Sequence, residues 1–434
     1  MVEKKLRKYL IPNIFAMMGT SCYLLADTFF ISSSGGANGI TALNLTLPIY
    51  GVMFAIGSMI GVGSATRYSL CKALGDNDAN DYLFQSLLWT VLFSSVFVLL
   101  GIFSPDGVLM LMGADNVILK TGVSYMKIIL CFAPTFMMNY TYTSFVRNDN
   151  APKLAMSATV FSNLFNIIFD YIFMFPMKMG MKGAALATGL APLVSMGICA
   201  SHFFSEKNNL RIICKGPSIK KLGIACSLGI AGFVGEIARA ITSMTFNFIL
   251  LHLAGNIAVA AYGVVANLSL IAISIFDGIS QGLQPLASEA EGTGNSDAKK
   301  RIVKHSLQIG VGIAAVLVLV YSVFAKEIVA VFNSENSTKM ASYAVNGLRL
   351  YSIGFLIAVV NIVRAGFFSA IGRAKECSVI SITRGIIANV FFVFTLPKMF
   401  GIYGVWLSFP VSEIFTFIVS LIFVKNKNNV PKIK

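Results

Sequence analysis

Long apolar runs, separated by short polar or basic stretches, follow one another along the whole chain. Each run holds about 20 residues or more, which lets a helix cross roughly 30 Å of hydrocarbon with every backbone polar group bonded internally. The pattern predicts an all-α integral membrane protein. We expect about twelve transmembrane helices, at residues 9–33, 41–66, 82–104, 121–146, 154–176, 183–204, 222–250, 257–284, 307–325, 343–370, 378–396 and 403–424.

The composition agrees with this pattern. Hydrophobic residues make up 56% of the 434 and charged residues only 12%, whereas about a quarter of a soluble domain is charged. The first run follows a basic start, "MVEKKLRK", as the core of a secretory signal would. It is too long for one, contains Pro12 and Asp27 and ends in no A-x-A site, so we expect the first transmembrane helix there.

Lysine and arginine gather in alternate loops. If the N-terminus is cytoplasmic, about 22 of them fall on the inner loops and termini and about 6 on the outer loops, so the positive-inside rule places both termini in the cytoplasm. The number of helices is therefore even. The net charge of +15 is then mostly a charge belt at the inner leaflet, and we expect no nucleic-acid partner.

Neither cysteine nor histidine indicates a cross-link or a metal centre. All seven cysteines lie in apolar runs or predicted cytoplasmic loops, which is not a disulfide pattern. The three histidines lie near the ends of runs, which argues against a metal site within the membrane. They are His202, His252 and His305.

Two sequence frames recur at nearly the same offset. "PMKMGMKG" matches "PKMFGIYG" 221 residues later, and "GDNDA" matches "GNSDA" 219 residues later. Each frame alone is an ordinary turn motif, but the shared offset indicates a duplicated unit of six helices. The chain then divides into an N-lobe at 1–205, a basic cytoplasmic linker at 206–221 and a C-lobe at 222–434.

An even number of helices in each half makes the two repeats parallel. Two such bundles with a cavity between them favour a transporter that works by alternating access over a receptor or a membrane enzyme. The chain has no G-x-x-x-x-G-K-[ST] motif, so transport would be secondary and driven by an ion gradient. We expect no cofactor, with Na⁺ or H⁺ as the coupling ion.

A polar stripe marks the stretch "SNLFNIIFDYIF". Asn163, Asn166 and Asp170 are spaced i, i+3 and i+7, which places them on one helix face. Two amides and a carboxylate are too costly to face lipid, so the stripe points into the bundle as a lining for Na⁺ or a proton. A polar cluster that only locks helices together is the alternative, although an amide would do that at lower cost than a carboxylate.

Asp27 lies in the first run, fifteen residues after Pro12. If Asp27 faces Asp170, the two carboxylates in a low dielectric would take up a proton or share a cation, which outlines a coupling site. Pro12 removes one backbone hydrogen bond and gives the helix a place to bend. A proline in the first turn of the helix is the alternative.

Several charged residues of the C-lobe could form ion pairs with one another. Glu236 and Arg239 are i, i+3 neighbours in "GEIARAI" and can neutralise each other. We favour a structural ion pair, with contact to substrate in a central cavity as the alternative. The other charged residues of the C-lobe are taken as structural by default. Asp277 and Glu413 could each pair with Arg384 or with Arg364.

The chain resembles the multidrug and toxic compound extrusion (MATE) family, in its bacterial DinF-like branch. The likeness covers nearly the whole chain and rests on five stretches in order: "LLADTFFI", "GVGSATRYSLCKALGDNDAN", "NIIFDYIFMFPMKMGMKGAALATGL", "GISQGLQPLASEAEG" and "SITRGIIANVFFVFTLPKMFGIYGVWLSFPVSE". It implies a two-lobed exporter that exchanges organic, often cationic, compounds for Na⁺ or H⁺. It also implies a monomer in the lipid bilayer of a bacterial-type inner membrane.

The resemblance also implies site residues. The N-lobe cation site would be formed by Asp27, Asn166, Asp170 and Thr188. Asn139 is the nearest match to an asparagine of helix four that relatives add. Pro12 resembles the proline of helix one whose bend accompanies ion binding.

In the C-lobe the resemblance is weaker. Glu236 resembles an acid of helix seven used by some branches, and with Arg239 and Asn163 it would line the substrate cavity. Helix ten departs from those branches because it offers Arg364 and no acid, which puts a C-lobe cation site in doubt.

Two other functions remain as alternatives. A lipid-linked oligosaccharide flippase of the same superfamily would use the arginines within the membrane, although it often has more helices. An integral membrane prenyl or acyl transferase would need a D-D-x-x-D or H-x-x-x-D motif, and none occurs in the chain. We therefore expect no enzyme.

Overall fold

The computed structural model describes residues 2–76, 78–112, 114, 116–206, 208–214, 216–332 and 337–425. Nearly all of them are helical, and no strand occurs among them. Some of the cations assigned above to the inner face lie outside this part of the chain. They are Lys207, Lys215, Lys427, Lys432 and Lys434.

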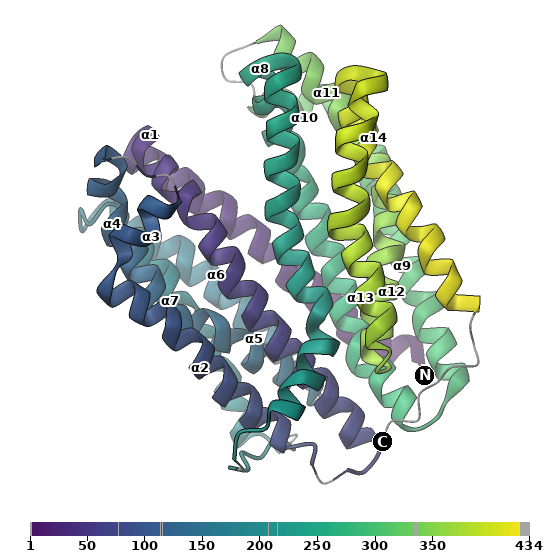
Figure 1. Cartoon of the computed structure of the whole chain (residues 1–434). Coiled ribbons are helices and arrows are strands. Elements are labelled where there is room, and N and C mark those ends of the chain that lie inside the picture. Colours follow the sequence, from purple (N-terminus) through teal and green to yellow (C-terminus); the bar gives the residue numbers. More distant parts are fainter. Residues whose placement is uncertain are drawn as a thin grey trace.

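The first half of the chain forms one group of helices, drawn in purple and blue in Figure 1. Its elements are α1 (Val2–Ala73), α2 (Asp81–Phe103), α3 (Pro105–Leu111), α4 (Asn116–Cys131), α5 (Ala133–Asn148), α6 (Pro152–Met174), α7 (Met181–Ala200) and the 3₁₀ turn η1 (Ser201–Phe204). Within α1 the chain reverses direction. This follows from a short distance between Gly39 and Ile31: a Cβ on Gly39 would lie 3.3 Å from the carbonyl oxygen of Ile31. Eight residues of straight helix would separate the two by about 12 Å.

The second half forms the group drawn in teal, green and yellow in Figure 1. Its elements are α8 (Ile219–Gly292), α9 (Ser296–Val323), α10 (Ala325–Phe332), α11 (Thr338–Ile353), α12 (Phe355–Ala370), α13 (Ala374–Ile382), the π-helical turn η2 (Thr383–Ile387) and α14 (Ala388–Lys425). Two of the long helices are divided by glycines with non-helical backbone, α8 at Gly255 and α14 at Gly401. Each is therefore a pair of helices.

The described residues contain nine helices that are long and apolar enough to cross a membrane, and α11 with α12, bent by 44°, makes a tenth. The span Ala374–Ile422 holds 49 residues, which as a straight helix would be about twice as long as the hydrocarbon core is thick. Gly401 divides it into two crossings. The pair α4 and α5 makes one more crossing. Together with the nine spans, the pair α11 and α12 and the division at Gly401, the described chain contains the twelve predicted crossings.

Two of the predicted runs are not continuous helices, and Pro12 does not have the alternative position considered for it. The run at 121–146 is not one helix but α4 and α5, which meet at Phe132 just before Pro134, a residue without a backbone donor. The run at 343–370 breaks at Gly354, where a Cβ would lie 2.6 Å from the ring of Phe409. Pro12 does not lie in a first turn, because α1 already begins at Val2.

The duplicated turn frame has the same backbone in both halves. Gly180 has φ 52° and ψ −132°, and Gly401 has φ 56° and ψ −136°, a region that residues with a Cβ rarely adopt. The second frame agrees, since Gly75 and Gly294 have φ of 72° and 67°. The repeat in sequence is thus a repeat in conformation.

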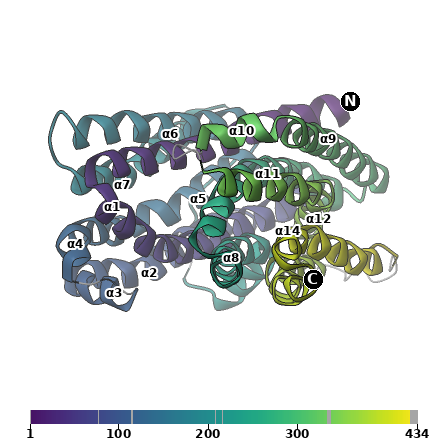
Figure 2. The ribbon, with the colours of Figure 1, turned by 90° about the horizontal axis from the view of Figure 1, so that it is seen from above.

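The two halves lie side by side and meet at one end. Figures 1 and 2 show α2–α7 on one side, α9 and α11–α14 on the other, and α8 between them. At the end where α1 begins, glycines of α8 bring the halves into backbone contact. A Cβ on Gly229 would lie 2.0 Å from the carbonyl oxygen of Met59, and one on Gly278 would lie 2.9 Å from that of Asn13. The ribbons diverge toward the opposite end.

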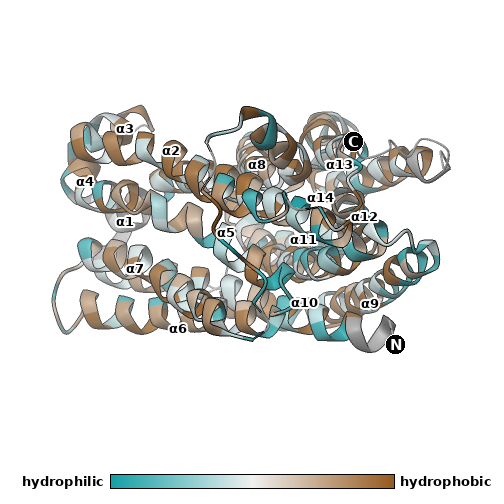
Figure 3. Ribbon diagram, turned by 90° about the horizontal axis from the view of Figure 1, so that it is seen from below, coloured by the Kyte–Doolittle hydropathy of each residue, from teal (hydrophilic) through white to brown (hydrophobic). Residues whose placement is uncertain are grey.

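The outer surface is apolar. Figure 3 shows hydrophobic colouring along most of the length of the helices. Large apolar side chains such as Phe103, Leu319 and Ile422 are exposed. In a chain with this many apolar helices, such a surface faces lipid, so the protein resides in a membrane.

Candidate functional site

The polar stripe of α6 faces α7 and α1 inside the first half. Asn166 and Asp170 are both buried. The Asn166 amide, oriented as its neighbours require, donates from nitrogen to Asp170 Oδ2 at 3.1 Å, and its oxygen accepts from Thr188 Oγ1 at 3.2 Å. Three of the four residues assigned to the cation site are therefore joined in one hydrogen-bonded chain.

Helix α1 completes the site because its first leg runs parallel to α6. Asn163 Nδ2 donates to Thr20 Oγ1 at 3.3 Å, and seven residues further along each helix the Asp27 and Asp170 carboxyl groups lie within hydrogen-bonding reach of each other. Gly19 permits this close packing, since a Cβ there would lie 3.3 Å from Asn163 Nδ2. The structure thus brings Asp27 and Asp170 together, as the polar pattern suggested.

The two carboxyl groups are deeply buried and incompletely bonded. Asp27 is 6% and Asp170 0% exposed, and the Oδ1 atom of each has no hydrogen-bond partner among the described residues. Two carboxylates at such a short separation in a low dielectric require a proton or a cation. Within the described chain no group of three or more His, Cys, Asp and Glu residues is arranged to hold a metal ion.

Two further residues were expected near this site. Asn139 lies on α5 with a buried Oδ1 that has no partner in the described part of the chain, and no hydrogen bond there joins it to Asp27 or Asp170. Pro12 lies in α1, fifteen residues before Asp27. Beside it the Asn13 side chain donates to the Tyr9 carbonyl oxygen at 2.8 Å.

In the second half a different buried carboxylate is paired. Glu413, which is 1% exposed, forms an ion pair with Arg384, with 2.8 Å between Nε and Oε1, and accepts a hydrogen bond from Asn361 Nδ2 at 2.8 Å. Of the two arginines considered from the sequence, Arg384 is therefore the partner. Arg364 donates instead to Ser420 Oγ at 2.6 Å.

Glu236 and Arg239 form the expected pair, with Arg239 Nη2 donating to Glu236 Oε1 at 3.2 Å. The pair is not buried: the side chains are 19% and 48% exposed, although they lie in the middle of the span Ile219–Gly255. The structure does not bring Asn163 to this pair, since Asn163 faces Thr20.

Comparison with known proteins assigns the fold to a family. The MatE family model matches the chain twice, over residues 12–172 and 233–395, which covers most of it. The chain belongs to the MatE family. The two matches fall on the two halves, so each half of this MatE protein is one copy of the family's unit.

Relatives of this MatE protein span nearly the same length. It is 24% identical over 433 residues to "Multidrug export protein MepA" of Staphylococcus saprophyticus, covering 98% of this chain and 93% of the relative. It is 25% identical over 423 residues to the MepA of Staphylococcus aureus strain N315, covering 95% and 91%. A solved structure described as the outward-facing conformation of a multidrug resistance MATE family transporter matches with a TM-score of 0.91 at 20% identity, covering 98% and 95%.

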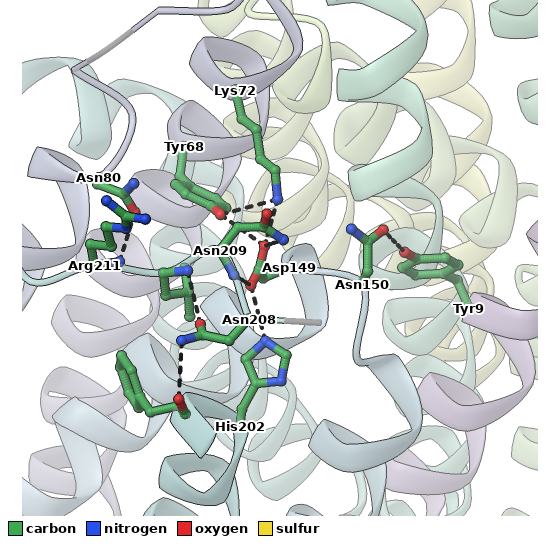
Figure 4. A network of polar contacts seen from close by, with 12 residues as sticks. Tyr9, Tyr68, Lys72, Asn80, Asp149, Asn150, His202, Asn208, Asn209 and Arg211 are labelled. Carbon is green, nitrogen blue, oxygen red and sulfur yellow. Dashed lines mark hydrogen bonds and ion pairs between the residues drawn. The ribbon is translucent and has the colours of Figure 1, made fainter. Parts of the chain in front are cut away.

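A second polar cluster of this MatE protein was not expected from the sequence. It lies around Asp149, directly after α5, at the end of the bundle where α1 begins (Figure 4). The side chain is 0% exposed and accepts hydrogen bonds from four residues. The donors are Tyr68 at 2.9 Å, Lys72 at 2.5 Å, His202 at 3.0 Å and the Asn209 backbone at 2.7 Å.

The environment of Asp149 sets its charge. Burial alone would raise the pKa of Asp149, but the hydrogen bonds from the Asn209 backbone, Lys72 and His202 outweigh burial and hold the pKa below its ordinary value. Asp149 therefore stays ionised. The one available signal in the sequence was an acid inside a basic loop, "VRNDNAPK".

The segment between the halves is tied to the first half. Besides Asn209, the Arg211 backbone donates to Asn80 Oδ1 at 3.0 Å and the Ser218 backbone to Gln85 Oε1 at 3.0 Å. Lys221 forms ion pairs with Asp78 and Asp81. These contacts fix where α8 begins.

Proposed function

We propose that this protein is a secondary active multidrug exporter that moves organic, often cationic, compounds outward in exchange for Na⁺ or H⁺. Membership of the MatE family and relatives named as multidrug export proteins support export of small molecules. The observation that carries the coupling is the buried, incompletely bonded carboxyl pair of Asp27 and Asp170. A purely structural pair would have complementary partners, as Glu413 has.

The proposed setting is a monomer in the lipid bilayer of a bacterial inner membrane, with both termini in the cytoplasm. The excess of lysine and arginine on the inner loops supports this orientation. The N-lobe would comprise residues 1–205 and the C-lobe residues 222–434, joined by the basic segment 206–221. Rocking of one lobe against the other would open the central cavity to each side in turn.

In the proposed cycle a cation or proton enters between Asp27 and Asp170 and removes their mutual repulsion. Asn166 and Thr188 would orient Asp170 and could supply neutral oxygens to Na⁺, with Asn139 as a further ligand. The change in charge alters how α1 packs on α6, and Pro12 gives α1 a place to bend. Reciprocity requires the ion to weaken substrate binding by the same factor by which substrate weakens ion binding.

The flippase alternative is weakened at three of the arginines within the membrane. It rests on arginines free to bind a pyrophosphate in the cavity, yet the structure pairs Arg384 with Glu413 and Arg239 with Glu236. Arg364 donates to Ser420 and stacks on Phe417, with 4.7 Å from guanidinium to ring centre. The positive charge of each is thus compensated or held against an aromatic ring.

The test is efflux of a fluorescent organic cation from proteoliposomes under an imposed Na⁺ gradient or, separately, a pH gradient. The parent should export under at least one gradient, and Asp170→Asn should abolish the response while remaining folded. Asp106→Asn, on the short helix α3 outside the site, is the matched control. A parent that responds to neither gradient would refute coupled export, and an Asp170→Asn variant as active as the parent would refute this coupling site.

A further inference from the structure

Helix α12 exposes one narrow face along its length. Of its 16 residues 11 are buried, and the five that are partly exposed are spaced so that they share a single face. These five residues, which we call the α12 stripe, are Leu356, Ile357, Val360, Arg364 and Phe367. Arg364 is the one charged side chain of α12, and it lies in an otherwise apolar stripe.

The α12 stripe faces lipid and not the space between the two halves. Gly366 lies two residues from Arg364, about 200° around the helix, and it packs so closely on α8 that a Cβ there would overlap the Ser280 side chain. On the flanks, Val359 contacts α9 and Asn361 hydrogen-bonds α14. Because α8 stands between the halves (Figure 2), the stripe on the opposite side of α12 is turned outward.

The Arg364 side chain extends toward the C-terminal end of α12. Asn361 donates to the Glu413 carbonyl oxygen at 2.9 Å, which places these two residues at the same level of their helices. Three residues or about 4.5 Å further along α12, Arg364 donates to Ser420, which lies seven residues or about 10.5 Å further along α14. The side chain therefore reaches about 6 Å toward the end of α12 at Ala370. Such snorkelling brings a guanidinium out of the hydrocarbon toward the lipid headgroups.

The Arg364 guanidinium has no counter-charge in the described part of the chain. Its hydrogen-bond acceptor is the Ser420 hydroxyl, which itself donates to the Phe417 carbonyl oxygen at 2.7 Å, and the centre of the Phe417 ring lies 4.7 Å from the guanidinium carbon. Both partners are neutral, and next to Phe417 the side chains of Ile418 and Leu421 are exposed. A cation at an apolar, lipid-facing surface requires an anion from outside the chain.

We propose that this surface binds an anionic phospholipid, with Arg364 holding the phosphate and the apolar residues of the α12 stripe contacting an acyl chain. Ile357 and Val360 precede Arg364 and so lie deeper in the membrane, where the chain of such a lipid runs. The positive-inside orientation places the end of α12 in the cytoplasm, so the lipid belongs to the inner leaflet, where basic sites between helices bind anionic headgroups.

The net charge of the lipid decides the choice of occupant. A zwitterionic lipid brings a cation of its own and leaves the charge of Arg364 uncompensated, and a free phosphate ion makes no use of the apolar residues beside it. The Ser420 hydroxyl orients the guanidinium, because its own proton is donated to Phe417. The proposal concerns the lipid-facing surface and does not depend on what the protein exports.

Binding of single lipids tests the proposal. The purified protein in detergent is titrated separately with phosphatidylglycerol, phosphatidylethanolamine and phosphatidylcholine of the same chain length, and native mass spectrometry gives the dissociation constant of the first lipid bound. The variants are Arg364→Gln, which removes the charge, and Arg364→Lys, which keeps it. Arg349→Gln is the matched control, because Arg349 is an exposed arginine of α11 that donates to the Ser322 carbonyl oxygen at 3.0 Å.

The parent should bind phosphatidylglycerol at least about tenfold more tightly than either zwitterionic lipid, because a charge-assisted contact to phosphate contributes a factor of that size. Arg364→Gln should reduce this preference to less than about twofold, and Arg364→Lys should retain part of it. Arg349→Gln should leave it unchanged.

A parent without the preference, or a folded Arg364→Gln protein that keeps it, would overturn the proposal. If Arg364→Gln does not fold, Arg364→Lys decides: retention of the preference supports the lipid site, and its loss from the folded lysine variant assigns Arg364 a structural role instead. An excess of inorganic phosphate distinguishes the source of the anion, since competition with phosphatidylglycerol would assign the site to free phosphate and overturn the assignment to a lipid.

Discussion

The two halves of the molecule share a frame but differ in what they hold inside it. At the offset of 221 residues that aligns the duplicated turns, Asp170 corresponds to Phe391 and Thr188 to Phe409. Phe409 stacks on Tyr351 with ring centres 4.2 Å apart, where Thr188 hydrogen-bonds Asn166. One copy of the unit thus keeps a polar contact between its fifth and sixth helices. In the other copy Phe409 packs against α11 and Phe391 is exposed, so neither side chain continues that contact.

The buried carboxyl groups within the membrane spans of the two halves also differ. Glu413 forms an ion pair with Arg384 and accepts a hydrogen bond from Asn361, so its charge is compensated. Asp27 and Asp170 have each other and a few neutral groups, and each retains an unpartnered oxygen. A carboxylate with complete partners stabilises one state, whereas an incomplete pair is completed only by an ion that can arrive and leave.

The largest expected effect is on transport. Asp27→Asn and Asp170→Asn should each slow ion-driven efflux about 100-fold, and the double variant should be no slower than either, because removing one member already destroys the shared ion site. Initial efflux rates in proteoliposomes check this. Effects that simply multiply in the double variant would show that the two residues act separately.

The second largest expected effect is on the free energy of unfolding, and it differs between a variant of each half. Glu413→Gln leaves Arg384 without its counter-charge and should lower the free energy of unfolding by about 3 kcal/mol. Asp170→Asn removes an uncompensated buried carboxyl and should leave that free energy unchanged or higher.

Denaturant titration in detergent measures both variants. Adding Arg384→Gln to Glu413→Gln should recover part of the loss, because it removes the unpaired cation. Equal destabilisation by Asp170→Asn and Glu413→Gln would contradict the distinction between the halves.

The smallest expected effect concerns Asp149. Asp149→Asn removes a buried, multiply bonded carboxylate and should cost about 2 kcal/mol near pH 7. Because the folded state lowers the pKa of Asp149, its contribution is present above the ordinary pKa and is lost as the pH falls through the lowered value, below about pH 4. Unfolding midpoints of parent and variant should therefore converge in acid, and a constant difference across pH would show that the charge is irrelevant.

Much of the architecture could be predicted from the sequence because it depends on local patterns. Apolar runs of sufficient length become spanning helices whatever they pack against. Both copies of the turn frame adopt the same backbone because their glycines permit a conformation closed to other residues. The spacing of Asn163, Asn166 and Asp170 put them on one face for the same reason, since helical period is a local property.

Only the tertiary structure decided which distant groups meet. The choice of Arg384 over Arg364 for Glu413, and the four donors around Asp149, depend on contacts between helices far apart in the chain. The exposure of Arg239 also depends on the tertiary structure. The sequence indicated only that Arg239 pairs with Glu236. The sequence by itself determined that the chain crosses the membrane and is duplicated, because the hydrogen bonding of the backbone and the helical period are local properties. Packing decided which carboxyl groups are paired and which are not.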